Sequence, residues 1–340
     1  MKASLAVLAL GLVAAVLAAP AEYDPTEWTV IPDENYNMHL VNMKDVEFEL
    51  ELAQRADFAV KFYLYTKSNP KTSQELVTGD EESVKRSHFN KDHPTRILSH
   101  GWRGDQNAPM NPMVRDKYLD RGDYNIIIVD WGAGAGSINY IKAAGNTVTA
   151  GKKVAALIDF LAEKAGLNTD NTYLIGHSLG GHVVGLAGKY TTRGKINTIF
   201  GLDAALPLFS INDPSKRLAK GDGRYVESIH TDGGILGFLD PLGDASFYPH
   251  WGKDQPGCGI DIVSACSHSR SYIYFAESLD NKDDFVSVKC PDFTDVKDEK
   301  CSLKGAEARM GGQPSNYGRG VEGVYYLPVN SKAPYATGRV

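Results

Sequence analysis

Short apolar segments alternate with segments of helical periodicity through most of this 340-residue chain, and this alternation limits its fold more than any other feature. The segments with the pattern of buried strands are Lys61–Thr66, Arg96–Ser99, Asn125–Val129, Thr172–Ile175, Thr198–Leu202 and Val226–Ile229. The helical segments are Thr147–Lys164, Leu179–Tyr190 and Ser269–Leu279. Strands that alternate with helices through short loops form a mostly parallel sheet with helices on both faces. The sequence therefore predicts an α/β protein whose ligand site lies at the carboxyl ends of the strands.

The amino-acid composition mainly excludes certain classes of protein and of partner. The chain is 42% hydrophobic, which is typical of a globular protein and excludes disorder and fibrous repeats. Its net charge of -6 argues against a nucleic-acid partner, because such binding needs a basic face. No repeat, low-complexity segment or linker follows Phe58, so we expect residues 56–340 to form one domain.

The first residues have the pattern of a secretory signal peptide. Lys2 precedes an apolar run from Leu5 to Ala18, and small residues follow before Pro20. The run is short for a membrane span, which needs about 20 residues, and an uncleaved anchor is the alternative. We therefore expect residues 1–19 to be a signal peptide, with cleavage between Ala18 and Glu22, and a secreted protein without a transmembrane segment.

Residues 20–55 are acidic and weakly patterned. The alternation in Val46–Arg55 fits either an edge strand or a helix that leads into the domain. A pro-peptide that is removed by cleavage near Arg55 is a further interpretation of this segment.

Four cysteines lie in two close pairs near the C-terminal end of the chain. Secretion makes them disulfide candidates with three connectivities, and closing short loops costs the least chain entropy. We therefore favour Cys258–Cys266 and Cys290–Cys301. A zinc site is the alternative, but the chain has no C-x-x-C spacing.

The segment Gly176–Gly180, with the sequence GHSLG, matches the G-x-S-x-G motif of serine hydrolases. A predicted buried strand precedes it and a predicted helix follows it. Ser178 would therefore lie on a sharp turn between strand and helix, where Gly176 and Gly180 leave room for a crowded backbone. An ordinary glycine-rich turn is the alternative to a nucleophile.

A serine nucleophile needs a base, and the base needs a carboxylate that orients it. In α/β-hydrolases the acid and then the histidine follow the serine in the chain, and Asp203 directly follows a predicted strand. The other candidates in this order are Asp232, Asp240 and Asp244 for the acid and His230, His250 and His268 for the base. Residue spacing alone leaves both His230 and His268 open.

An oxyanion hole needs two backbone N–H donors that are already in place. The N–H of Leu179, next to Ser178, is one candidate. The segment Ser99–Trp102 follows another predicted strand and is similar to the H-G-x loops of such enzymes, so we name Trp102 as the second donor. Simple core packing of His100 and Trp102 is the alternative.

Several separated motifs resemble the pancreatic lipase family of animal neutral lipases, especially its short, secreted insect-type members. The motifs are Arg96–Trp102 (RILSHGW), Asp130–Trp131, Gly176–His182 (GHSLGGH), Gly201–Pro207 (GLDAALP), Ile229–Gly233 (IHTDG) and Cys266–Tyr272 (CSHSRSY). The resemblance extends from about Phe58 to the C-terminus and implies an α/β-hydrolase fold. It implies Ser178, Asp203 and His268 as nucleophile, acid and base, with Trp102 and Leu179 as oxyanion donors. It also implies the same two disulfides.

The chain departs from the family pattern at several places. Ala204 stands where family members usually have proline after the acid. In Pro214–Asp222, which corresponds to the calcium site of the pancreatic enzymes, most carboxylates are missing, so we expect no metal and no cofactor. Little chain follows Tyr326, so we expect no C-terminal β-sandwich domain and no colipase.

The loops Gly259–Ala265 and Gly233–Gly243 are shorter than those that cover the site in triacylglycerol lipases. Family members with both loops short are typically phospholipases A1 or galactolipases, so we expect a glycerolipid substrate at a lipid–water interface. The apolar side chains of Leu236, Phe238 and Leu239 would suit an acyl chain, or would fill the core beneath the loop. The alternatives are a triacylglycerol lipase and a non-catalytic lipid carrier similar to the insect yolk proteins.

Overall fold

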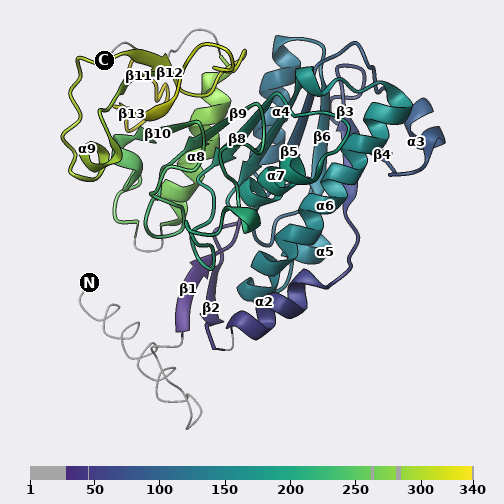
Figure 1. Cartoon of the computed structure of the whole chain (residues 1–340), viewed down its shortest axis with the longest axis horizontal. Coiled ribbons are helices and arrows are strands. Elements are labelled where there is room, and N and C mark those ends of the chain that lie inside the picture. The colour runs from purple at the N-terminus through teal and green to yellow at the C-terminus, as the bar shows by residue number, and fades with distance from the viewer. Residues whose placement is uncertain (1–27, 45, 262–263, 281–284, 339–340) are drawn as a thin grey trace, which may run out of the picture.

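A large twisted sheet forms the centre of the computed structural model, which describes residues 28–44, 46–261, 264–280 and 285–338 (Figure 1). Its strands are β3 (Lys61–Tyr65), β4 (Gln74–Leu76), β5 (Thr95–Ser99), β6 (Asn125–Asp130), β7 (Thr172–His177), β8 (Thr198–Leu202), β9 (Tyr225–Ile229), β10 (Ala245–Pro249), β11 (Val286–Lys289), β12 (Glu307–Arg309) and β13 (Gly323–Leu327). Within the described ranges, these eleven strands follow the order β12-β11-β13-β10-β9-β8-β7-β5-β6-β3-β4. From β13 to β6 in this order, each strand is parallel to its neighbours. At the two ends of the sheet the pairing is antiparallel: β11 pairs with β12 and β13, and β3 pairs with β4 and β6.

Helices cover both faces of the sheet, as the continuous apolar strands require. The described helices are α2 (Val46–Gln54), α3 (Glu81–Lys85), α4 (Met110–Arg121), α5 (Gly132–Ala135), α6 (Tyr140–Ala165), α7 (Leu179–Tyr190), α8 (Ala265–Ser278) and α9 (Phe293–Lys297). In β6, Ile127 and Val129 belong to the core beneath α6 and α7, whereas Ile126 and Ile128 belong to the core beneath α4 and α8. Both faces of a parallel strand are therefore buried, which confirms the predicted α/β class with a mostly parallel sheet.

The predicted elements agree with the structure most closely at the centre of the sheet. The predicted strand Thr198–Leu202 and helix Leu179–Tyr190 have the bounds of β8 and α7. Helix α6 begins several residues before the predicted Thr147, because the Asn139 side chain caps it by accepting the N–H of Ile141 at 2.9 Å. Of the two alternatives for Val46–Arg55, the structure has the helix, α2.

The order of the strands locates a crevice. From β5 the chain continues to β6 on one side, whereas β7, β8 and β9 follow on the other side. Ligands of open α/β sheets bind where the strand order reverses in this way, outside the carboxyl ends of the strands. That point lies between β5 and β7, which the Ser99–Trp102 loop and Ser178 follow directly.

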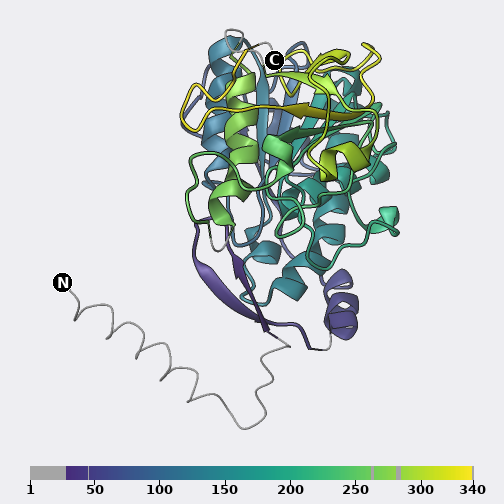
Figure 2. The same ribbon diagram turned by 90° about the vertical axis from the view of Figure 1, so that its left-hand side faces the viewer.

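An antiparallel hairpin, separate from the large sheet, precedes α2. It consists of β1 (Trp28–Pro32) and β2 (Met38–Asn42), and it lies below the sheet in both views (Figures 1 and 2, purple). Ile31 and Val41 are buried in the same core as Trp102. Residues 1–19, the predicted signal peptide, lie outside the described residues. Within the described ranges, none of the helices combines the length and the apolar character needed to cross a bilayer.

The two local cysteine pairs are disulfide-bonded, as the sequence analysis favoured. Cys258–Cys266 closes the loop before α8, and Cys266 itself lies in the first turn of that helix. Cys290–Cys301 joins the end of β11 to the segment after α9. The first disulfide therefore fixes the start of α8 in place.

Helices α6 and α7 cross closely at Gly151. A Cβ atom at this position would lie 2.6 Å from Leu186 Cβ and 3.1 Å from the Val183 carbonyl oxygen. We predict that Gly151→Ala lowers the stability by about 1–3 kcal/mol through overpacking, despite the better helix propensity of alanine. Thermal and urea unfolding would measure the loss, with Lys152→Ala as the neighbouring control. A raised midpoint for Gly151→Ala would contradict this account of the crossing.

Candidate active site

Ser178 occupies a strained turn between β7 and α7. Its backbone angles are φ 55° and ψ -125°, a conformation that residues with side chains rarely adopt. The neighbouring glycines make the turn feasible. A Cβ at Gly176 would lie 2.1 Å from the Gly180 carbonyl oxygen, and one at Gly180 would lie 2.2 Å from the Ser99 carbonyl oxygen. The turn therefore has the geometry of a nucleophile elbow.

The sharp turn is held by backbone hydrogen bonds to β8 and to the loop after it. The N–H of Ser178 donates to the Leu202 carbonyl at 3.1 Å. The Ser178 carbonyl accepts from the N–H of Gly181 at 3.0 Å and of Ala205 at 3.2 Å. These bonds connect the turn to the strand that carries Asp203.

Asp203 directly follows β8 and is completely buried. Its Oδ2 lies 2.6 Å from His268 Nδ1, and its Oδ1 accepts the N–H groups of Thr231 at 2.7 Å and Asp232 at 3.0 Å. Since a carboxylate only accepts, Nδ1 of His268 carries the hydrogen and Nε2 is free to accept a proton. Asp203 thus orients the imidazole and selects its tautomer.

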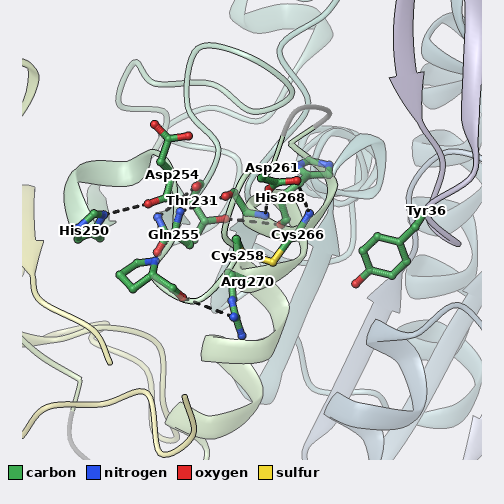
Figure 3. Close-up of a disulfide and its surroundings, with 12 residues drawn as sticks. Tyr36, Thr231, His250, Asp254, Gln255, Cys258, Asp261, Cys266, His268 and Arg270 are labelled. Atoms are coloured by element: carbon green, nitrogen blue, oxygen red, sulfur yellow. Dashed lines mark hydrogen bonds between the residues drawn. A yellow bond between two sulfur atoms is a disulfide. The ribbon is translucent and has the colours of Figure 1, made fainter. Parts of the chain in front are cut away.

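His268 lies in the first turn of α8. This helix begins at Ala265, before the predicted start at Ser269, so His268 is part of the helix and does not precede it. Asp261 caps this turn by accepting the N–H groups of Ser267 at 2.7 Å and Cys266 at 3.3 Å. Figure 3 shows Asp261 and His268 close to the Cys258–Cys266 disulfide. A carboxylate at the helix N-terminus and a covalent bond together position the imidazole.

Ser178 and His268 line the same pocket, together with Trp102 and Leu236. The free volume of this pocket is about 20 Å³, enough for one water-sized group. In the described part of the chain, Ser178 Oγ and His268 Nε2 are not hydrogen-bonded to each other. Such contacts commonly shorten when substrate binds.

Two backbone N–H groups beside Ser178 and in the pocket wall have no acceptor in the described part of the chain: Trp102 lines the pocket, and Leu179 directly follows Ser178 in the chain. Among the described residues, neither the N–H of Trp102 nor that of Leu179 donates a hydrogen bond. The Trp102 side chain is buried, and its Nε1–H donates to the Ser137 carbonyl at 2.8 Å. Packing of the ring therefore fixes the loop and leaves the backbone N–H available. Core packing of the Trp102 ring is thus compatible with a role of its backbone N–H as a hydrogen-bond donor.

His177 is a buried histidine beside His268, with ring centroids 4.5 Å apart. Its Nδ1 lies 2.8 Å from Glu34 Oε1 and its Nε2 lies 3.3 Å from the His268 carbonyl oxygen. Burial opposes its charge, but the Glu34 carboxylate outweighs burial and raises the pKa of His177. Burial, followed by the charge of His177, lowers the pKa of His268 against the opposing effect of Asp203. His268 is therefore neutral at physiological pH, as a base must be.

Two of the other candidates for acid and base, His230 and Asp232, have structural partners. His230 donates from Nδ1 to the Phe238 carbonyl at 2.6 Å and pairs with the Ser228 hydroxyl at 2.8 Å. Burial and the nearby Asp203 raise the pKa of Asp232 to about 8, and its carboxyl accepts the N–H of Leu236. His230 is thus a buried, hydrogen-bonded histidine, the alternative considered for it above.

The predicted substrate contacts lie in different environments. Leu236 lines the pocket with Ser178. Phe238 is buried in the core and contacts the His182 ring edge-on at a centroid distance of 6.0 Å. Leu239 packs against another core cluster, around Tyr248. Only Leu236 of these three residues therefore borders the described cavity.

Two clusters in the described part of the chain hold three potential metal-ligand atoms within 4.8 Å of one another. One contains Cys258, Asp261 and Cys266, but its sulfur atoms form the disulfide. The other contains Asp203, Asp232 and His268, of which Asp203 and His268 are hydrogen-bonded to each other. In the calcium-like region, Lys189 forms an ion pair with Asp222.

One wall of the pocket comes from residues that the sequence analysis did not select. The cavity is also lined by residues at the end of β1 and directly after it, namely Ile31, Pro32, Asp33 and Glu34. No motif or periodicity marks these residues. Their proximity to Ser178 is a long-range contact that only the folded chain reveals.

Comparison with known proteins relates the whole described domain to lipases. A family model described as Lipase matches residues 32–335. Lipase member H-B of Xenopus laevis is 36% identical over 249 residues, which are 72% of this chain and 53% of that protein. Pancreatic triacylglycerol lipase of Mus musculus is 32% identical over 313 residues, 84% of this chain and 66% of that protein. The chain therefore spans about half the length of the first relative.

Among solved structures, a thermophilic esterase from Thermogutta terrifontis with bound butyrate is 14% identical, with a TM-score of 0.35. The match covers 54% of this chain and 72% of that chain.

The lowered pKa of His268 predicts how the reactivity of Ser178 depends on pH. Labelling of Ser178 by an organophosphate needs neutral His268, so it is lost as the pH falls through the pKa of that residue. We expect a midpoint below the ordinary histidine value of about 6.5. Labelling rates measured by mass spectrometry between pH 4.5 and 8 would give the midpoint, with circular dichroism as a control for folding. A midpoint at or above about 7 would contradict this electrostatic account.

Proposed function

Because the chain belongs to the pancreatic lipase family, we propose that it is a secreted carboxylic ester hydrolase that cleaves acyl esters of glycerolipids at a lipid–water interface. The observation that carries this proposal is the hydrogen bond between buried Asp203 and His268, because His268 lines the same pocket as Ser178. The two disulfides support an extracellular location, where such bonds persist.

In the proposed mechanism, Ser178 Oγ attacks the acyl carbonyl carbon while His268 Nε2 removes its proton. Asp203 stabilises the imidazolium that forms. The N–H groups of Trp102 and Leu179 bind the developing oxyanion, and each such donor contributes about 3 kcal/mol in the transition state. Their lack of other acceptors supports this role.

His268 then donates its proton to the glycerol oxygen, which leaves as an alcohol. The acyl group stays on Ser178 as an ester. Water enters, loses a proton to His268 and attacks this ester through a second tetrahedral intermediate. When this intermediate collapses, the bond between Ser178 Oγ and the acyl carbon breaks, and His268 returns its proton to Ser178 Oγ. The products are a fatty acid and the deacylated lipid.

Among glycerolipids, we propose phospholipids or galactolipids, cleaved at the 1-acyl position. The Asp261 carboxylate accepts the N–H of Ser267 in the first turn of α8, so this part of the short Cys258–Cys266 loop is held by hydrogen bonds as well as by the disulfide. Leu236, Phe238 and Leu242 anchor the second loop by burial. Loops held in this way cannot form a large apolar cover, which favours a substrate with a bulky polar headgroup.

A triacylglycerol lipase is the alternative within the enzyme class. The relative from Mus musculus is named as a pancreatic triacylglycerol lipase, which favours this alternative. A lipid carrier without activity is the alternative from another class, and the presence of Ser178, Asp203 and His268 argues against it.

We predict that Ser178→Ala abolishes ester hydrolysis with folding intact. Asp203→Asn should lower kcat by about 10³–10⁴-fold, because His268 loses the partner that selects its tautomer. The matched variant Asp232→Asn should stay within about threefold of wild type, because this carboxyl is largely protonated at neutral pH. Hydrolysis of a soluble p-nitrophenyl ester would measure all three. Equal losses in the two aspartate variants would contradict the assignment of Asp203.

The headgroup proposal predicts a substrate order. Phospholipid or galactolipid should release its 1-acyl chain at least about tenfold faster than triacylglycerol, because the anchored loops leave the headgroup in solvent. The substrates would be offered in the same mixed micelles, with analysis of the position of the released chain and Ser178→Ala as the blank. Predominant cleavage of triacylglycerol would refute the argument from the loops.

A further inference from the structure

Glu34 reaches from the N-terminal hairpin into the crevice between β5 and β7. Its Oε1 accepts the N–H of Gly101 at 2.5 Å and the Nδ1–H of His177 at 2.8 Å. The side chain is only 2% exposed. A single carboxylate oxygen therefore joins the segment that follows β5 to the last residue of β7, the neighbouring strand.

These two segments carry the proposed oxyanion donors. Gly101 immediately precedes Trp102, and His177 immediately precedes Ser178 and Leu179. The backbone of Glu34 adds a third bond, because its N–H donates to the Trp102 carbonyl at 3.1 Å. Glu34 thus holds the loop after β5 and the turn after β7 at a fixed separation.

The turn of the hairpin is built to present Glu34. The neighbouring Asp33 Oδ1 accepts the N–H groups of Asn35 and Asn37, each at 2.9 Å. Asp33 Oδ2 lies 2.9 Å from His39 Nε2 and 3.2 Å from Arg103 Nε, so the turn is tied to the loop that follows Trp102.

A second contact ties the tip of the hairpin to α8. Tyr36 extends from the hairpin toward that helix, and its hydroxyl lies 3.2 Å from the Tyr272 hydroxyl (Figure 3). The hairpin is therefore anchored both to the loop after Trp102 and to α8.

Electrostatics support the same arrangement. A buried carboxylate is costly unless a cation and hydrogen bonds compensate it. Burial alone would raise the pKa of Glu34, but the His177 imidazolium outweighs burial and lowers it. Each partner therefore favours the charged form of the other inside the crevice.

Building on the proposed function, we propose that Glu34 is a positioning residue that holds the two halves of the oxyanion hole in register. The hairpin, residues 28–42, consequently belongs to the active enzyme. Cleavage near Arg55, as in the pro-peptide interpretation, would remove Glu34 and leave the Gly101 N–H and His177 without their common acceptor.

The consequence of losing this contact is a slower chemical step. Displacement of reacting groups by about 1 Å costs about 10²-fold in rate. Loss of one oxyanion donor costs about 10²–10³-fold in kcat. Glu34→Ala should therefore lower kcat by about 10–100-fold with little change in KM, because the surfaces that bind the substrate remain. Glu34→Gln keeps an oxygen acceptor but not the charge, so at about pH 8, where an ordinary histidine is neutral, it should restore kcat to within about threefold of wild type.

The test compares kcat and KM of these variants on soluble p-nitrophenyl butyrate, with thermal unfolding in parallel. Glu51→Ala is the matched control, because Glu51 lies on α2 with a side chain that is 63% exposed and distant from the crevice. We expect Glu51→Ala to equal wild type. Should Glu34→Ala fail to fold, Glu34→Asp replaces it, since the shorter side chain cannot keep both bonds.

Three results would overturn the proposal. One is a kcat of Glu34→Ala, or of its replacement, within about threefold of wild type. Another is a rise in kcat, which would make Glu34 an inhibitory charge. The third is active secreted enzyme whose N-terminus, determined by mass spectrometry, lies after Glu34. Failure of the proposed function is recognised separately, because wild type and Ser178→Ala would then hydrolyse the ester equally slowly.

Discussion

The candidate site depends on the strained backbone at Ser178. A residue with a side chain occupies φ 55° and ψ -125° only if its surroundings compensate the cost of a few kcal/mol. Here the compensation comes from bonds to Leu202, Gly181 and Ala205 and from glycines that allow neighbouring backbone to approach. The same turn directs the proposed nucleophile into the pocket and exposes the N–H of Leu179. The strained conformation of Ser178 and the placement of the candidate catalytic groups therefore result from the same turn.

Topology brings the remaining groups to this turn. Trp102 follows β5, Ser178 follows β7 and Asp203 follows β8, so three parallel neighbours deliver their side chains and N–H groups to one edge of the sheet. His268 lies on α8, which packs on the face of β8 that α7 does not cover. The Cys258–Cys266 disulfide fixes the start of this helix. The residues are far apart in the chain, yet the strand order requires that they meet.

The elements that sequence analysis predicted are those determined by local pattern. Strand, turn and helix around Ser178 follow from an apolar run, two glycines and helical periodicity, and β8 ends where Asp203 stands. The starts of α6 and α8 were misplaced because single polar side chains, Asn139 and Asp261, decide them. Glu34 was missed for a different reason: it contacts His177 across 143 residues, and such a contact leaves no periodic trace in the sequence.

The contact between Glu34 and His177 also bears on the charge of the base. Two carboxylate–histidine pairs lie side by side in the crevice, and the two imidazole rings are 4.5 Å apart. Both imidazoles cannot be charged at low cost at this distance. Glu34 stabilises the charge on His177, and that charge disfavours a second one on His268. The hairpin that carries Glu34 thus also favours a proton on His177 over one on His268, the candidate base beside Ser178.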